Sequence, residues 1–397
     1  MAPTATAHME SRDLHTCHVC GEGTFVGVPA FSKLARVTSD SRPWPGGGRL
    51  GVCASCVSIQ KPVDAAWLAE RERVYGSYDL YADGDAADQA VFDAATGDAE
   101  LRNARLVARF EAEFELPRVG RLLDVGCGKG AFLRAFGERF AGWTLAGCDQ
   151  GEANRSEIEA IPGVETYTAG PPAEKAGEFD LIAMSHVLEH VPHPVPFLSD
   201  LRSTLRDGGL LLVHGPNVAN NPFDLVVVDH CTHFVASTVS AVATAAGYVV
   251  ERVAEDWVAK ELTMVARSAP PASAQEKPIA APTDPEEASR SVVTTTAWLQ
   301  GVAEAARMLA EEGRLGILGT TIAGVWLDAE TGGRAAFFCD EDASRAGKQL
   351  LGRPVILPAE AEAPADIYIP MPHAIAERIA RRLARDGIRY HVPPAIH

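Results

Sequence analysis

A glycine-rich turn between an apolar strand and a helix constrains the fold of this chain more than any other segment. The stretch RLLDVGCGKGAFL (121–133) begins with a buried strand over Leu122–Val125 and ends in the first turn of a helix. Gly126, Gly128 and Gly130 lie between them, where the backbone must adopt positive φ and approach a ligand closely. This order of elements predicts one unit of a parallel α/β sheet that binds a ligand at its carboxyl edge.

An acidic residue follows the turn at the spacing of a nucleotide site. The segment LAGCDQ ends a second apolar strand with Asp149, nineteen residues after Gly130. A carboxylate at this position can accept hydrogen bonds from two ribose hydroxyls. Dinucleotide-binding domains and S-adenosylmethionine (SAM) domains share both features, so the motif alone leaves both classes open. It predicts five cofactor-binding residues, which are Asp124, Gly126, Gly128, Gly130 and Asp149.

The third strand separates these two classes. FDLIAMSHVLEHV (179–191) predicts a strand over Phe179–Met184, with HVLEHV at the mouth of the ligand site. A helix, a Gly-Gly turn and a further strand follow in LRSTLRDGGLLLV. The whole series over residues 121–267 resembles the class I SAM-dependent methyltransferases, whereas a hydride-transfer enzyme has no reason for the HVLEHV segment. The resemblance implies SAM as cofactor and adds Ser185 and His186 to the cofactor-binding residues.

Two cysteine pairs precede this core. TCHVCGEG contains Cys17 and Cys20, VCASC contains Cys53 and Cys56, and 32 residues separate the pairs. In a reducing compartment this spacing is typical of a zinc site in which each CxxC supplies two thiolates. Four thiolates leave no position for water, so the predicted Zn²⁺ is structural. A redox CxxC and four unrelated buried thiols are the alternatives.

Charge and hydropathy exclude several kinds of partner. The formal net charge is −17 and no run is rich in Lys or Arg, which argues against nucleic acid or an anionic membrane surface as the main partner. No apolar run approaches the ~18 residues that a membrane span needs. The first fifteen residues, MAPTATAHMESRDLH, lack the apolar region of a signal peptide. We therefore expect a cytoplasmic protein that acts on a small molecule.

Composition predicts three domains and one linker. Residues 10–75, interrupted by Gly and Pro, are assigned to a zinc-binding domain, and residues 76–267 to the methyltransferase domain. The Pro- and Ala-rich stretch 268–290 reads as a linker. A helix over about 288–312 and an alternating unit from RLGILGTTIAG predict a second Rossmann-like domain over 291–397. The predicted fold class is α/β, with a class I SAM methyltransferase core between the two flanking domains.

Three segments narrow the resemblance. Three segments are similar to the sugar C-methyltransferase family: CASCVSIQ, the stretch from LGILGTTIAG to GRPVILP, and FDLVVVDHCTHF (223–234). The similarity covers nearly the whole chain. That family methylates the third ring carbon of nucleotide-linked 4-keto-6-deoxy sugars. The resemblance implies such a nucleotide-linked sugar as substrate, in the biosynthesis of an antibiotic or other specialised metabolite.

Two positions depart from the family. Val227 stands where the family has Tyr, and Asp229 stands where it has Glu. Because Val227 has no hydroxyl to bind a sugar oxygen, an O- or N-methyltransferase acting on a sugar or other specialised metabolite stays open. A binding module without catalytic activity is the remaining alternative.

Histidine is the predicted base. A carbon beside a ketone becomes a methyl acceptor when a base removes its proton, and histidine titrates near the working pH. We predict His230 as that base, Asp229 or Glu189 as the group that orients it, and His186 as a ligand of the keto oxygen or a proton relay. Both histidine segments should reach the carboxyl edge of the sheet and face one cavity. Val227 should make this cavity apolar and favour a neutral His230.

Three further residues are predicted to bind substrate. Tyr78 fits a recurrent Tyr of the family, Asn217 follows a strand in HGPNVANNP, and Lys348 could meet a diphosphate. By contrast, His190 and His233 are expected to be structural or surface residues.

Overall fold

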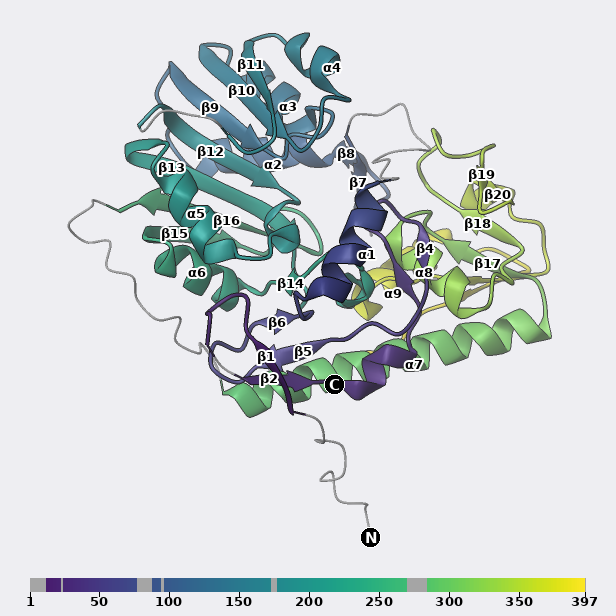
Figure 1. The fold of residues 1–397 in the computed structure, drawn as a ribbon. Coiled ribbons are helices and arrows are strands. Elements are labelled where there is room, and N and C mark those ends of the chain that lie inside the picture. Colours follow the sequence, from purple (N-terminus) through teal and green to yellow (C-terminus); the bar gives the residue numbers. More distant parts are fainter. Residues whose placement is uncertain are drawn as a thin grey trace.

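The computed structural model describes residues 12–22, 24–76, 88–93, 96–172, 177–269 and 284–396. The chain forms three larger sheets, which we call the N-terminal, middle and C-terminal sheets (Figure 1). Helix α1 (Ala65–Tyr75) lies between the middle sheet, drawn in blue and teal, and the C-terminal sheet, drawn in green and yellow.

The middle sheet has seven strands in the order β11-β10-β9-β12-β13-β16-β15. The first five run parallel, and β16 and β15 close one edge as an antiparallel hairpin. This topology is that of the class I SAM methyltransferases and confirms the predicted fold class. The strands are β9 (Gly120–Val125), β10 (Trp143–Asp149), β11 (Val164–Ala169), β12 (Phe179–Ser185), β13 (Leu205–Pro216), β15 (Tyr248–Ala254) and β16 (Glu261–Ser268).

Helices bury both faces at the centre of the middle sheet, which explains why the central strands β9, β10 and β12 are largely apolar. Successive strand residues point to opposite faces, so Leu122 packs in a cluster with α2 and α3, whereas Leu123 packs in another with α5 and α6. Both leucines are fully buried. The helices are α2 (Arg102–Glu113), α3 (Ala131–Arg139), α4 (Arg155–Glu159), α5 (Pro194–Arg202) and α6 (Ala236–Ala245).

The N-terminal sheet takes its last strand from the middle domain. Its order is β1-β2-β5-β6-β14, and β14 (Thr232–His233) pairs with β6 (Ile59–Gln60), with Thr232 opposite Gln60. The predicted zinc-binding segment is therefore hydrogen-bonded to the segment predicted to carry the base. The other elements here are β1 (Arg12–Thr16), β2 (Thr24–Gly27), η1 (Pro29–Lys33), β3 (Arg36–Val37), β4 (Pro43–Trp44) and β5 (Gly51–Cys53).

The C-terminal sheet has the order β19-β20-β18-β17-β21-β22 and is parallel except for β19. The long helix before it, α7 (Pro285–Glu312), starts three residues before position 288, because Asp284 caps it through the Glu286 N–H and Pro285 suits the first turn. The last six residues of the stretch predicted as linker are thus helical. The remaining elements are β17 (Leu315–Leu318), α8 (Ile322–Glu330), β18 (Phe337–Cys339), β19 (Gln349–Leu350), β20 (Arg353–Ile356), η4 (Pro358–Glu360), β21 (Ala365–Tyr368), α9 (His373–Leu383) and β22 (Ile388–His391).

One hydrophobic core joins all three parts of the chain. Phe223 of η3 (Pro222–Val226) packs edge-on against Trp298 of α7 and Trp326 of α8. Phe31 and Val227 belong to the same cluster, and both are fully buried, with 0% relative exposure. The segment that carries the predicted base is therefore anchored in a core shared with both flanking domains.

The described residues between α1 and α2 form no helix. A short hairpin of β7 (Ala90–Phe92) and β8 (Ala99–Leu101) precedes α2. Tyr78 lies outside the described residues. Among the described residues, no helix combines the length and apolar character that a membrane span requires.

Candidate active site and cysteine cluster

The glycine turn has the backbone conformation that the sequence predicts. Gly126, Gly128 and Gly130 have φ values of 71°, 52° and 78°. A Cβ atom on Gly126 would lie 2.4 Å from a methyl group of Val187, so only glycine fits there. This contact also places the HVLEHV segment directly against the turn.

Two carboxyl groups flank this turn. Asp149 Oδ2 accepts a hydrogen bond from the Gly128 N–H at 2.7 Å, and its Oδ1 accepts one from the Gln150 N–H at 2.6 Å. Asp124 is buried and its Oδ2 has no hydrogen-bond partner among the described residues. Burial and the charge of Asp149 raise the pKa of Asp124 well above its usual value. The turn is therefore a preorganised cradle with an acid at its rim, which fits a nucleoside cofactor.

A single buried carboxylate holds two histidines. Asp224 Oδ1 lies 2.6 Å from His230 Nδ1, and Asp224 Oδ2 lies 2.6 Å from His233 Nδ1. Lys61 Nζ lies 2.9 Å from His233 Nε2. The Asp224 carboxylate only accepts, so His233 carries a proton on Nδ1, and in the neutral ring Nε2 is the acceptor that faces Lys61. With Nδ1 of His230 likewise occupied by Asp224, its Nε2 is left as the nitrogen for chemistry.

The pKa values of the two histidines on Asp224 are shifted in opposite directions. Burial lowers the pKa of His230, but Asp224, Glu189 and Asp229 outweigh burial and raise it above its ordinary value. Val227 was expected to favour a neutral His230, but its side chain lies in the shared core, and the carboxylates around the ring favour the charged form. Burial and the nearby Lys61 lower the pKa of His233 to about 4.

Glu189 connects the two predicted catalytic histidines. Its Oε1 lies 3.4 Å from His186 Nδ1, and its carboxylate lies within 4.8 Å of ring nitrogens of both His190 and His230. The rings of His190 and His230 are perpendicular, with centroids 4.6 Å apart. We call His186, His190, His230 and His233 the histidine cluster. The structure thus brings His186 and His230 to one place, as the position of their segments predicts.

His186 has a second set of charged neighbours. Its φ is 57°, which is uncommon for a non-glycine residue and is often found at functional sites. Its Nε2 lies 3.0 Å from Arg102 Nη1 and 3.2 Å from Glu261 Oε1. Glu261 also lies 2.6 Å from His214 Nε2. Burial and Arg102 lower the pKa of His186, but Glu261 and Glu189 outweigh them and raise it to about 9.

Asp229 is not the residue that orients His230. Its carboxylate accepts hydrogen bonds from the Ser39 N–H at 2.9 Å and the Ser39 hydroxyl at 2.5 Å, and it lies 3.4 Å from His190 Nδ1. Asp224 orients His230 instead. The sequence contained one signal for this, an acid six residues before His230, which was not among the residues predicted to orient the base.

The other residues of the site could not be found by local inspection. Only folding brings four residues from separate segments to the histidine cluster, namely Lys61, Arg102, His214 and Glu261. His190 was expected to be structural but contacts His230. The histidine cluster therefore has more polar and charged neighbours than the sequence motifs around His186 and His230 indicate.

Two predicted substrate-binding residues lie outside the histidine cluster. Asn217 is fully buried, and its amide donates to Glu255 Oε1 at 2.6 Å and accepts from the Ala219 N–H at 3.2 Å. Lys348 is exposed on the loop between β18 and β19, at the edge of the C-terminal sheet. Their roles in substrate binding stay predictions.

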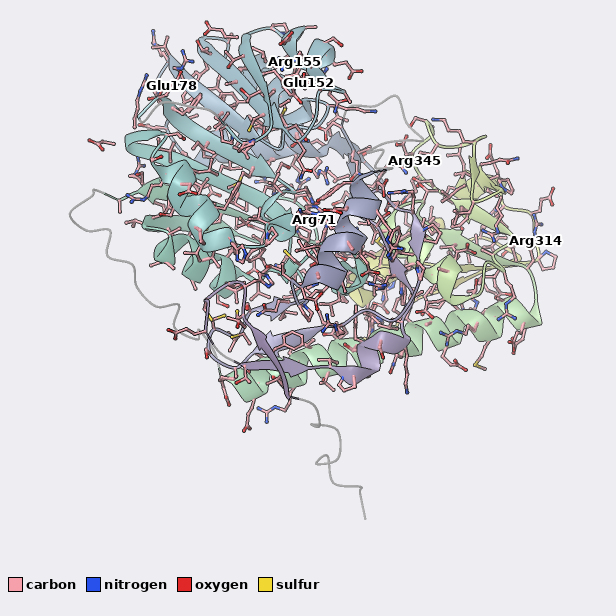
Figure 2. The ribbon with its side chains drawn as sticks, in the orientation of Figure 1. Arg71, Glu152, Arg155, Glu178, Arg314 and Arg345 are labelled. Carbon is pink, nitrogen blue, oxygen red and sulfur yellow. The ribbon has the colours of Figure 1, made fainter. Side chains whose placement is uncertain are left out.

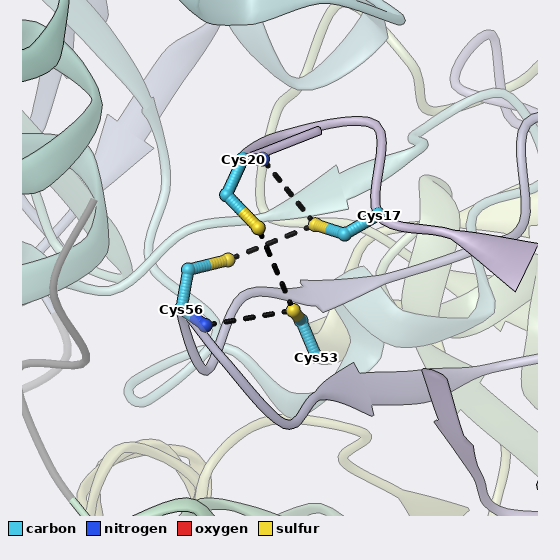
Figure 3. Close-up of side chains that lie close together, drawn as sticks. All are labelled: Cys17, Cys20, Cys53 and Cys56. Atoms are coloured by element: carbon cyan, nitrogen blue, oxygen red, sulfur yellow. Dashed lines mark hydrogen bonds between the residues drawn. The ribbon is translucent and has the colours of Figure 1, made fainter. Parts of the chain in front are cut away.

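The four cysteines of the two pairs meet in one cluster (Figure 3). Cys17 Sγ lies 3.7 Å from Cys56 Sγ, and Cys20 Sγ lies 3.8 Å from Cys53 Sγ, so neither pair is a disulfide. Tetrahedral coordination with metal–sulfur bonds of about 2.3 Å requires a sulfur separation of about 3.8 Å. Gln60 Nε2 donates to Cys17 Sγ at 3.0 Å. The donor set and its spacing fit Zn²⁺.

Two consecutive residues, Gln60 at the end of β6 and Lys61 after it, connect the cysteine cluster with the histidine cluster. Gln60, which contacts Cys17, precedes Lys61, whose Nζ donates to the Val227 and His230 carbonyls at 2.6 and 2.9 Å. The structure therefore makes the N-terminal module the support of the His230 loop.

The C-terminal sheet repeats the turn geometry of the middle sheet. Gly319 follows β17 with a φ of 99°, and the Thr320 N–H lies 3.2 Å from Asp340 Oδ2 at the end of β18. The same relation joins Gly128 and Asp149 in the middle sheet.

Comparisons with known proteins agree with the fold of the middle domain. Residues 96–253 match the family model described as "Methyltransferase domain", so the chain contains a methyltransferase domain of the class I SAM-dependent fold. This match covers less than half of the chain. The N-terminal module and the C-terminal sheet lie outside it.

Curated relatives match over part of the same region. The ubiquinone biosynthesis O-methyltransferase of Caulobacter sp. is 34% identical over 118 residues, which are 27% of this chain and 46% of that protein. The enzyme of that name from Marinobacter nauticus is 32% identical over 120 residues, covering 27% and 49%. The chain spans less than half the length of these relatives. A solved SAM-dependent methyltransferase from Mesorhizobium loti aligns with 41% of this chain and 97% of its own, at 19% identity and a TM-score of 0.33.

Proposed function

We propose that the protein is a SAM-dependent methyltransferase in which His230 removes a proton from the acceptor. The observation that carries this proposal is the 2.6 Å contact between His230 Nδ1 and Asp224 Oδ1. It fixes the ring so that Nε2 is the basic nitrogen, which is how a carboxylate prepares a histidine base in other enzymes. The imidazolium that forms is stabilised by Asp224 and Glu189, which favour the charged ring.

The cofactor would lie in the glycine cradle of the middle sheet. Gly126, Gly128 and Asp149 would hold the nucleoside, with the Asp149 carboxylate at the ribose, and Ser185 and His186 follow at the end of the next strand. SAM supplies the methyl group when it is bound there. Because Val187 touches Gly126 and His186 lies beside it in sequence, the cofactor edge and the histidine cluster are neighbours.

His186 would serve the acceptor as a hydrogen-bond donor. Its pKa of about 9 makes it positively charged at neutral pH, which suits a ligand of a keto or hydroxyl oxygen better than a base. A charged ring has no acceptor nitrogen for Arg102, whose approach at 3.0 Å opposes the charged form, whereas Glu261 and Glu189 can accept from the ring. The two carboxylates outweigh the guanidinium, so the ring is held in its charged form.

Within this class we propose C-methylation of a nucleotide-linked keto-deoxy sugar. A ketone acidifies the neighbouring C–H, so a single histidine base suffices to make carbon the acceptor. The second turn at Gly319, with Asp340 at the following strand end, supports a substrate that carries a nucleotide. The cysteine cluster and the second Rossmann-like sheet support the three-part organisation of the sugar C-methyltransferase family.

We also propose a structural Zn²⁺ held by Cys17, Cys20, Cys53 and Cys56. The sulfur separations and the hydrogen bond from Gln60 to Cys17 support a tetrathiolate site. With four protein ligands the ion has no open position for substrate. Its effect on chemistry would pass through the placement of Lys61 and the His230 loop.

An O-methyltransferase is the second candidate, because the curated relatives described above carry that name. The same base would then remove a hydroxyl proton. Incubation with methyl-labelled SAM and two acceptor panels, keto-sugar nucleotides and hydroxylated metabolites, tests both proposals. NMR of the product separates C-methyl from O-methyl.

Variants sharpen this test. His230→Ala should lower kcat by about 10²–10⁴ while SAM affinity stays near that of the wild type. His193→Ala, which changes an exposed histidine before α5, is the matched control. Failure of the wild type to methylate any acceptor of either panel would refute the proposed activity, and a threefold or smaller loss in His230→Ala would refute the assigned base.

A further inference from the structure

Helix α1 directs three side chains, spaced four residues apart, toward the histidine cluster. Trp67 Nε1 donates to the Val228 carbonyl at 3.1 Å, and the Tyr75 hydroxyl lies 3.2 Å from His190 Nδ1. Residues four apart share one face of a helix, so Arg71 lies between these two anchors. Figure 2 labels Arg71 on the side of α1 that faces the middle sheet.

The guanidinium of Arg71 has no hydrogen-bond acceptor within the described part of the chain. Among the described residues it makes no hydrogen bond and no ion pair, although its Nε is buried. Its two neighbours on α1 are aromatic, with the guanidinium carbon 5.6 Å from the Trp67 ring centre and 5.9 Å from that of Tyr75. These stacking contacts hold the position of the cation but leave the buried Nε–H without an acceptor among the described residues.

An unpaired arginine is unusual for this part of the chain. On the same helix, Arg73 lies 3.8 Å from Glu70, and Glu70 also pairs with Arg36 at 2.8 Å. A buried N–H donor without an acceptor destabilises the folded protein. A bound ligand that supplies the acceptor would remove this cost.

Two of the three carboxylates around the histidine cluster accept hydrogen bonds from other groups. Asp224 accepts from two histidines and Asp229 accepts from Ser39. Glu189 faces His186 and the rings of the histidine cluster. None of these three carboxylates pairs with Arg71, and among the described residues its Nε has no hydrogen-bond partner.

We propose that Arg71 binds an anionic oxygen of the methyl acceptor, beside His230. This inference rests on the proposed function, since it takes the histidine cluster as the place where the acceptor loses its proton. A guanidinium presents parallel N–H donors that match a carboxylate, a phosphate or an enolate.

The charge on that oxygen can have two sources. It is present in the bound substrate if the group is a carboxylate or phosphate. It develops during the reaction if the acceptor proton moves to His230 Nε2 and its electron pair becomes an enolate or alkoxide. That electron pair then forms the bond to the methyl carbon as the carbon–sulfur bond of SAM breaks and S-adenosylhomocysteine leaves. In the second case Arg71 stabilises charge where it appears.

Oxalate is a suitable first probe, because it is a planar dianion that mimics both a carboxylate and an enolate. The full-length protein, with its zinc and with S-adenosylhomocysteine, is titrated by calorimetry. We expect one oxalate per chain for the wild type and binding at least tenfold weaker for Arg71→Met. Arg73→Met, which changes the exposed arginine two residues later, should bind as the wild type does. Arg71→Lys keeps the charge and stem and should retain intermediate affinity.

This titration needs no methyl transfer, so it is independent of the proposed function. Absence of saturable oxalate binding to the wild type, or equal affinity in the folded Arg71→Met and Arg71→Lys variants, overturns the proposal. If Arg71→Met does not fold, Arg71→Lys alone decides. With an acceptor from the two panels, a resident anion predicts a KM increase of at least tenfold in Arg71→Lys. A developing oxyanion predicts a kcat decrease of at least tenfold at unchanged KM. If Arg71→Lys changes neither KM nor kcat, the proposal is also overturned. The His230→Ala variant then tests the assignment of the base separately.

Discussion

Replacement of Asp224 by Asn tests how the buried carboxylate controls His230. The native carboxylate receives the Nδ1 protons of His230 and His233, one on each oxygen at 2.6 Å. An Asn side chain has one acceptor oxygen and one NH₂ donor. One of the two histidines must then lose its partner or turn to the other tautomer. Lys61 holds His233 in place through Nε2, so we expect His230 to be the ring that changes.

The size of the effect follows from the charge that is removed. An opposite charge within 4–6 Å typically shifts a pKa by about 1–3 units, and here the contact is shorter and both groups are buried. We therefore expect the pKa of His230, which is raised in the native protein, to fall by about 1–3 units in Asp224→Asn. Loss of the correct tautomer should lower kcat by about 10²–10⁴. The acidic limb of the kcat/KM profile should move to lower pH, because the remaining base titrates at lower pH.

Nitrogen-15 NMR of the imidazole groups measures both the tautomer and the pKa without any substrate. Asp229→Asn is the comparison variant, since that carboxylate binds Ser39 and affects His230 only at longer range. The shift in Asp229→Asn should be smaller than in Asp224→Asn. An unchanged His230 pKa and tautomer in folded Asp224→Asn, or a larger change in Asp229→Asn, would show that Asp224 does not prepare the base.

Three further predictions concern the metal, the cofactor and pH. Protein purified without chelator should contain about one Zn²⁺ per chain by elemental analysis, and Cys53→Ser should lose the ion and lower the unfolding temperature; absence of zinc from the wild type contradicts this. Asp149→Ala should weaken calorimetric SAM binding by about 1.5–3 kcal/mol through the loss of charged hydrogen bonds, and unchanged affinity would place the ribose elsewhere. The pKa of His186 rises from 6.5 to about 9, so its contribution to stability is complete below pH 6.5 and disappears toward pH 9. Denaturant unfolding of the wild type and His186→Gln should therefore show a stability difference that declines over this range, and a constant difference would contradict it.

The sequence by itself determined the features that depend on neighbours along the chain. Positive φ at Gly126 and Gly130 follows from the glycine spacing, and Asp149 follows from the end of an apolar strand. Each CxxC pair brings its own two sulfurs close because it forms a tight turn, whereas the pairing of β2 with β5 brings the two pairs together. Apolar runs long enough for buried strands predicted a parallel sheet, since helices must cover both of its faces. The resemblance over residues 121–267 assigned that sheet to the class I methyltransferases.

Only the tertiary structure decided which charged groups surround the base. Val227 was expected at the cavity but lies in the core shared with α7 and α8, because its strand-like segment packs against the N-terminal module. Lys61 is 172 residues from His233 and touches it through the pairing of β6 with β14. Neither contact leaves a local pattern. Hydrogen bonds and pKa values depend on distances between groups that folding brings together, and for Asp224 and Lys61 those distances are set by a sheet that crosses two domains.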